Sequence, residues 1–153
     1  MTLLEFVIKS KLTGYASGGE GQEKKFEDGS QGFEIISDGY RYLDRYYGFN
    51  PFFGSEHIFD SDDTMLWAMN YFGEIIKESS DPQVIYSFLK EAMLQISSEY
   101  PFRGPANHER SSLRYTNQQN GSFDHFHGIE SIYQNDEKIY VLYYHGGKIQ
   151  RDT

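Results

Sequence analysis

Residues 64–76 have the sequence TMLWAMNYFGEII, the longest stretch that is apolar at nearly every position, and they include the chain's only tryptophan, Trp67. At a period of two the stretch has two apolar sides, Met65, Trp67, Met69, Tyr71 and Ile75 on one and Leu66, Ala68, Phe72 and Ile76 on the other. Such a strand lies in the middle of a sheet that is covered on both faces, or in a sheet that curls around its own core. The alternative is a helix, because apolar side chains also share one face at a period of 3.6. The hairpin signals on both flanks favour the strand.

Composition and charge restrict the class of protein. A length of 153 residues predicts one domain, residues 1–153. The formal charge of −9 argues against direct nucleic-acid binding and against docking on anionic membranes, because both need a basic surface. The absence of cysteine excludes thiolate chemistry. No apolar run reaches the roughly 18 residues of a membrane span, and residues 1–11 do not resemble a signal peptide, so we expect a soluble, cytoplasmic protein.

The first predicted helix spans residues 2–12, with Thr2 as its cap and Gly14 placed to end it. Its expected apolar side consists of Leu3, Leu4, Val7, Ile8 and Leu12. Residues 15–32 are rich in glycine and charged side chains and predict a loop. The sequence GGEG at 18–21 lacks the lysine and the strand–helix context of a phosphate-binding loop, so we interpret it as a flexible connection.

Four strands are predicted after this loop, and together they form a meander. The first two, residues 33–37 and 40–47, are joined at Asp38-Gly39, a strong hairpin signal. Residues 56–59 form a short third strand. A polar turn then leads into the central stretch, residues 64–76.

The second half of the chain repeats the order of a helix followed by strands. Its helix begins at Asp81-Pro82, an aspartate cap followed by proline in the first turn. Its apolar face consists of Ile85, Phe88, Leu89, Ala92, Met93 and Ile96. Three further strands are predicted near residues 113–116, 122–129 and 138–145, with turns at Asn120-Gly121 and Asn135-Asp136. No repeat of fixed period is evident. The pattern predicts an α+β fold with two helices packed on a strongly twisted or barrel-like antiparallel sheet of about six to eight strands.

Short motifs extend over nearly the whole chain: KLTGYASGG at 11–19, WAMNYFG at 67–73, FRGP at 102–105, FHGIESI at 126–132 and HGG at 145–147. Together they resemble a bacterial family of uncharacterised domains that carries only a placeholder name. The resemblance implies a domain that stands alone or follows a helix-turn-helix DNA-binding domain of the XRE type in transcriptional regulators. It therefore implies a sensing or dimerising role, and it implies no catalytic residue.

A carboxylate and an arginine are candidates for a polar site in the core. Glu130 shares an otherwise apolar strand side with Phe126, Gly128 and Ile132. A carboxylate that faces a core is costly unless it is paired or protonated. The favoured interpretation is an ion pair with Arg103, and the alternative is a pocket in which Arg103 binds an anionic ligand.

Aromatic side chains around the central stretch suggest a small-molecule pocket. Asn70 interrupts one apolar side of the stretch, and a buried amide needs hydrogen-bond partners. Trp67 and Tyr71 lie on the other side, and Tyr42 and Tyr46 lie on a neighbouring predicted strand. Apolar pockets with a few polar groups are the usual form of ligand sites. An ordinary aromatic core with one satisfied amide is the favoured interpretation of these residues.

Three histidines offer weak metal-binding candidates. His125 and His127 lie two residues apart, so they share one side of a strand, and a three-residue loop at the following turn would place His145 opposite His127. Surface histidines on a hairpin are the simpler interpretation, and we favour no metal and no cofactor.

No triad, nucleophile elbow or paired catalytic carboxylates can be identified, which favours binding over catalysis. We expect a non-enzymatic module that binds or senses a small molecule at Trp67, Asn70, Tyr71, Tyr42, Arg103 and Glu130. The alternatives are a homodimeric interaction module, which would use a strand edge and a tyrosine-rich surface, and a metal-dependent enzyme that would use the histidines.

Overall fold

The computed structural model describes residues 1–14 and 23–151, in which nine antiparallel strands form a single sheet. The order across the sheet is β1-β2-β3-β4-β5-β9-β8-β7-β6. The strands are β1 (Lys24–Lys25), β2 (Gln31–Ser37), β3 (Tyr40–Gly48), β4 (Phe52–Asp60), β5 (Met65–Ile75), β6 (Asn107–Arg110), β7 (Leu113–Ser122), β8 (His125–Gln134) and β9 (Glu137–Lys148). The sheet is strongly twisted but not closed into a barrel, so the α+β prediction is confirmed in its open form.

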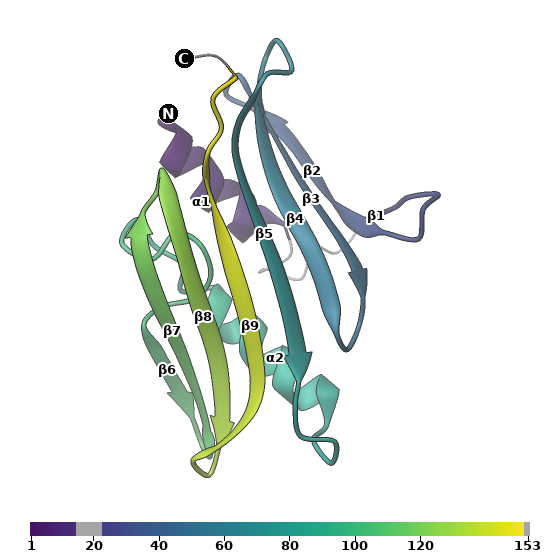
Figure 1. Ribbon diagram of the computed structural model, residues 1–153, viewed down its shortest axis with the longest axis vertical. Helices are drawn as coiled ribbons and strands as arrows, with labels where there is room; N and C mark the ends of the chain where they lie inside the picture. The colour runs from purple at the N-terminus through teal and green to yellow at the C-terminus, as the bar shows by residue number, and fades with distance from the viewer. Residues whose placement is uncertain (15–22, 152–153) are drawn as a thin grey trace.

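Two helices, α1 (Leu3–Thr13) and α2 (Pro82–Met93), lie on the same face of the sheet, behind it in Figure 1. We call the covered face the inner face and the opposite one the outer face. Neither helix in this part of the chain is long and apolar enough to cross a membrane. The GGEG sequence at 18–21 lies outside the described residues.

The central stretch is strand β5, and it pairs with β4 on one side and β9 on the other. The strand prediction is therefore confirmed, and the helical alternative is wrong. Trp67, Met69 and Tyr71 are buried on the inner face, whereas Phe72 on the outer face is 44% exposed. Both helices lie on the inner face, so the expectation of a sheet covered on both faces is wrong.

The helix caps agree with the sequence, but the buried side of α1 differs. The Thr2 side chain accepts a hydrogen bond from the Glu5 amide, and the Glu5 carboxylate accepts one from the Thr2 amide. Gly14 ends the helix. The buried residues of α1 are Phe6, Val7, Ser10 and Lys11, whereas Leu4, Ile8 and Leu12 are only half-buried. The buried side of α1 is therefore rotated relative to the predicted apolar side. The reason is that polar partners, which the periodicity of the helix does not reveal, hold Lys11 inside.

The strands of the second half differ from prediction at one turn and by an additional strand, β6, and the described residues form nine strands where about six to eight were expected. Asn120 and Gly121 lie within β7, and Phe123-Asp124 makes the turn instead. Phe123 occupies this position because its ring stacks on Trp67 at 5.3 Å and its carbonyl accepts a hydrogen bond from the indole nitrogen. The turn at Asn135-Asp136 is confirmed, and both residues have positive φ.

The two units of a helix followed by strands are confirmed. The first comprises α1 and β2–β5, the second comprises α2 and β6–β9, and the last strands of the two units, β5 and β9, pair in the middle of the sheet. The core between helices and sheet is therefore shared by the two halves.

Candidate functional site

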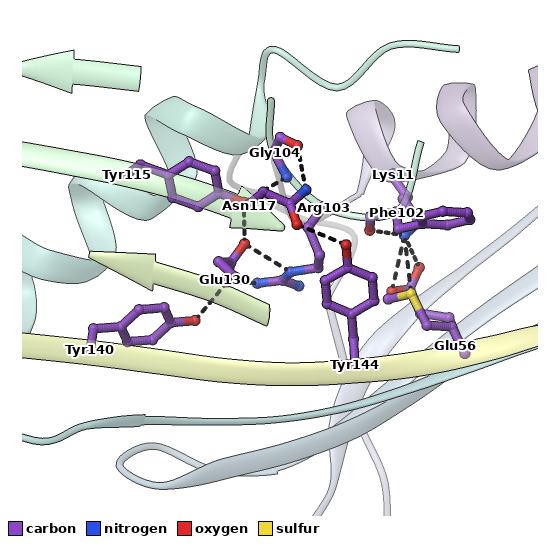
Figure 2. A network of polar contacts seen from close by, with 11 residues as sticks. Lys11, Glu56, Phe102, Arg103, Gly104, Tyr115, Asn117, Glu130, Tyr140 and Tyr144 are labelled. Atoms are coloured by element: carbon purple, nitrogen blue, oxygen red, sulfur yellow. Dashed lines mark hydrogen bonds and ion pairs between the residues drawn. The ribbon is translucent and has the colours of Figure 1, made fainter. Parts of the chain in front are cut away.

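Charged side chains lie between the helices and the inner face of the sheet. Within the described residues, five of them are at most 2% exposed: Lys11, Asp44, Glu56, Arg103 and Glu130. Buried charges are costly unless ion pairs and hydrogen bonds compensate for the lost water. The partners of these five groups therefore define the polar core of the molecule, and Figure 2 shows all of the five except Asp44.

Glu130 of β8 is the centre of the polar core in the second half. Arg103 donates to both of its carboxylate oxygens, with Nε at 3.1 Å and Nη2 at 2.9 Å. The hydroxyl groups of Tyr115 and Tyr140 donate to the same carboxylate at 2.6 and 2.8 Å. The predicted Arg103–Glu130 pair is confirmed, and its hydrogen bonds within the protein satisfy the carboxylate.

The FRGP segment is held in place by the strands beneath it. The Gly104 amide donates to the Tyr115 hydroxyl at 2.9 Å, and the Asn117 side chain donates to the Gly104 carbonyl at 2.9 Å. The Tyr144 hydroxyl donates to the Asn117 Oδ1 at 2.7 Å. These contacts orient Arg103 toward Glu130 (Figure 2).

Glu56 of β4 occupies the matching place in the first half. The Lys11 ammonium lies 3.2 Å from its carboxylate and also donates to the Phe102 carbonyl. The Tyr42 hydroxyl donates to Glu56 at 2.6 Å. Burial lowers the pKa of Lys11, and the nearby Glu56 opposes this shift.

Asp44 of β3 is the third buried carboxyl group. The Tyr71 hydroxyl donates to its Oδ1 at 2.7 Å, and Glu56 lies directly opposite on β4. Burial and then the negative charge of Glu56 raise the pKa of Asp44 to about 8. Asp44 therefore holds a proton near neutral pH.

The polar cores of the two halves repeat one another. Tyr42, Asp44, Gly54, Glu56 and Tyr71 correspond in order to Tyr115, Asn117, Gly128, Glu130 and Tyr144. In each set a tyrosine donates to the glutamate and another donates to the Asp or Asn side chain. Lys11 and Arg103 are the cations of the two sets.

A signal for this repeat is present in the sequence. The pattern F-x-G-x-E-x-I occurs at residues 52–58 and again at 126–132. The sequence analysis recognised the two units of a helix followed by strands but not this shared pattern. The repeat is difficult to recognise because the pattern covers one strand in each half, and because Asp44 and Lys11 are replaced by Asn117 and Arg103.

A cavity of about 440 Å³ opens between α2 and the strands of the first half. Asp44 and Tyr71 belong to its lining, together with Tyr46, Gly48, Phe49, Phe52, Gln83, Tyr86, Ser87, Leu89 and Lys90. Five of these eleven residues are aromatic, and Phe49 and Phe52 meet Tyr86 edge-on at ring distances of 5.1 and 5.8 Å. The volume and the few polar groups are typical of small-molecule sites.

The predicted site residues are divided between two faces of the sheet. Trp67, Tyr42, Arg103 and Glu130 are buried on the inner face, and of the predicted residues Tyr71 and Tyr46 belong to the cavity's described lining. Asn70 lies on the outer face, because neighbouring residues of a strand point to opposite sides. The expectation that Asn70 joins Trp67 and Tyr71 in one pocket is therefore wrong.

Asp44 is one of the site residues that the sequence analysis missed, together with Lys11, Glu56 and Tyr86. The sequence signal for Asp44 is that its carboxylate lies on the same side of the predicted strand as Tyr42 and Tyr46. That signal is weak, because strand β3 alone does not show which of its sides faces the helices.

The histidines lie on the outer face, away from the cavity. His127 pairs directly with His145, as predicted, although a two-residue turn and a bulge at Ile132/Tyr133 set this register. His125 and His145 border a hollow of about 510 Å³ on that face. Within the described residues, no three His, Asp or Glu side chains form a group that could hold a metal ion.

The architecture is that of an α+β protein with one twisted antiparallel sheet, a duplicated polar core and a ligand-sized cavity beneath its second helix. The family model described as "Domain of unknown function (DUF5680)" matches residues 44–149, and the chain belongs to this family. This confirms the resemblance at the level of an uncharacterised domain family. No curated protein and no solved structure has a significant match to the chain.

Proposed function

We propose that the protein is a non-enzymatic module that binds a small molecule in the cavity between α2 and strands β3–β5. The observation that supports this proposal most strongly is the cavity itself, of about 440 Å³, with aromatic walls and a buried carboxyl group among them. Pockets of about 300–1,000 Å³ enclose ligands of ordinary metabolite size. A sensing role in a regulator would rest on the same binding.

The walls of the cavity are held in place by hydrogen bonds of their own. The Tyr86 hydroxyl donates to the Phe49 carbonyl at 2.6 Å, and the Tyr46 hydroxyl donates to Glu23 at 2.7 Å. A ligand that enters would meet aromatic rings whose orientation is already set. Binding to a pre-organised site costs less conformational entropy than binding that must order its own walls.

The test is native mass spectrometry on protein purified without chelator or affinity nickel, combined with a thermal-shift screen of a metabolite library. A Ser87→Phe variant would place a ring in the cavity, and Val84→Phe is its control because Val84 lies on the same helix, outside the cavity lining, and is exposed. We expect a stoichiometric adduct or a stabilising compound with the wild type and the control variant, and neither with Ser87→Phe. Equal behaviour of both variants toward the bound compound would overturn the proposal.

A second candidate function, self-association, is favoured by the outer face. Four exposed aromatic residues occupy one continuous row across β3, β4, β5 and β9: Tyr47, Phe53, Phe72 and Tyr143. Contiguous exposed apolar side chains often mark interfaces. A homodimer through this row predicts that light scattering at high concentration gives twice the monomer mass and that Phe72→Ser restores the monomer. A monomeric wild type would exclude it.

A further inference from the structure

The buried charges of the polar core are unequal in number. Lys11 and Arg103 are its two cations, and each forms its ion pair with a glutamate, Glu56 or Glu130. Asp44 is a third carboxyl group, and no ion pair in the described part of the chain includes it. A buried carboxylate without a cation is strongly unfavourable, so position 44 carries a cost that the fold must tolerate.

The second half of the molecule shows that the fold does not require a carboxyl group at this position. The corresponding residue there is Asn117, whose Oδ1 accepts the Tyr144 hydroxyl at 2.7 Å. Asp44 accepts the Tyr71 hydroxyl at the same distance. An amide oxygen therefore accepts the tyrosine hydroxyl as well as a carboxyl oxygen does. The fold does not need the acidic group at position 44 for this hydrogen bond.

The surroundings of Asp44 differ from those of Asn117, whose side-chain amide also donates to the Gly104 carbonyl, and Asp44 belongs to the lining of the cavity. Five aromatic residues share that lining: Tyr46, Phe49, Phe52, Tyr71 and Tyr86. Aromatic faces attract ammonium and quaternary ammonium groups, and a nearby carboxylate supplies the counter-charge. Aromatic walls around a single carboxyl group are the combination that selects an organic cation.

We propose that the cavity binds a small organic cation, an amine or quaternary ammonium group on an apolar body, with Asp44 as its counter-charge. This inference rests on the proposed function, and it adds the chemical class of the ligand. Lys90 is the one cationic side chain in the described lining, and it is exposed to solvent at the helix surface, where water screens its charge. Asp44 is buried, so its charge acts on the ligand with less screening.

Binding of the cation is coupled to loss of the Asp44 proton. The titratable groups that interact with Asp44 are Glu56, Tyr71, Lys11, Arg103, Tyr42 and Tyr46, and its carboxyl group is protonated near neutral pH. A cation favours the carboxylate form, so it would displace the proton, and its affinity would increase as the pH rises toward 8. A neutral ligand would not show this increase.

The experiment is isothermal titration of the full chain with three probes of similar size: benzyltrimethylammonium, benzyl alcohol and benzoate. We expect the cation to bind best and to release about one proton at pH 7, measured in two buffers of different ionisation enthalpy. In Asp44→Asn the affinity for the cation should fall at least about tenfold. The control is Asp136→Asn, which removes a carboxylate from an exposed turn and should leave the affinity unchanged.

The outcomes distinguish a failure of this inference from a failure of the proposed binding function. If benzyl alcohol or benzoate binds as tightly as the cation, or if Asp44→Asn binds the cation as well as the wild type does, the cation class is overturned while the cavity remains a binding site. If the cation binds but Ser87→Phe does not weaken it, the cavity is not its site. If neither the three probes nor the metabolite library binds, both proposals are overturned.

Discussion

Asp44 determines a pH dependence of stability that can be predicted from its surroundings. Its pKa is raised in the folded state to about 8, whereas an aspartate in the unfolded chain has a pKa of about 3.9. Between these values the unfolded chain has released the proton and the folded chain has not. The contribution of Asp44 to stability is therefore fully present below about pH 4 and is lost as the pH rises toward 8.

Asp44→Asn removes this dependence while keeping an acceptor for the Tyr71 hydroxyl. The wild type loses stability relative to the variant as the pH rises. We therefore expect the difference in free energy of unfolding, variant minus wild type, to increase by at least about 1.4 kcal/mol from pH 5 to pH 8, the equivalent of one pKa unit. Urea unfolding at the two pH values measures it. Asn117→Asp is the reciprocal variant and should lose stability over the same interval. A gain for Asp44→Asn that does not change with pH would contradict this account.

Glu130 is the residue whose loss should cost most. Glu130→Gln keeps the size of the side chain but leaves the Arg103 guanidinium buried without its counter-charge. Removing one partner of a buried pair costs about 3–5 kcal/mol, and we expect a loss of this size in urea unfolding. The matched control is Glu137→Gln, whose pair with Lys77 is exposed and should contribute little. Similar losses in both variants would show that burial of the pair is unimportant.

At the scale of the element, glycine allows the tyrosines of the central strands to cross their neighbours. A Cβ at Gly54 would lie 2.3 Å from the Tyr71 hydroxyl, and one at Gly128 would lie 2.2 Å from the Tyr144 hydroxyl. We expect Gly54→Ala and Gly128→Ala each to cost about 1–3 kcal/mol through overpacking of the inner face. Chemical denaturation measures the effect. Ser55→Ala, on the outer side of the same strand, is the control, and an equal loss there would refute the explanation.

Helix α1 shows the limit of local patterns at this scale. Its cap and its end follow from Thr2, Glu5 and Gly14, because capping depends on neighbours within one turn. Its buried side does not follow from its sequence. Lys11 is inside because Glu56 and the Phe102 carbonyl, far along the chain, provide its partners.

At the scale of the whole molecule, the two halves should unfold together. The sheet is continuous through β5 and β9, and Trp67 of the first half stacks on Phe126 of the second at 5.5 Å. We expect tryptophan fluorescence and far-UV circular dichroism to give a single coincident urea transition. A fluorescence transition at clearly lower urea than the dichroism transition would show that the halves separate.

The fold could be predicted further than the site. The hairpin at Asp38-Gly39 and the turn at Asn135-Asp136 depend on turn chemistry that is local, and both were predicted. The Arg103–Glu130 pair was predictable because a lone carboxylate in an apolar strand side needs a partner. The cavity was not, because Asp44 on β3 and Tyr86 on α2 are brought together only when the helix packs on the sheet.

By itself the sequence determined the helices, most of the strands and the antiparallel α+β class, because periodicity, caps and turns act between near neighbours. Only the tertiary structure decided which face of the sheet is covered, which lysine is buried and where the cavity lies. Those properties depend on contacts between residues far apart in the chain. The same contacts place Asp44 in the cavity lining, whereas Asn117 occupies the corresponding position in the polar core of the second half. This difference makes the first half of the repeated core a candidate binding site.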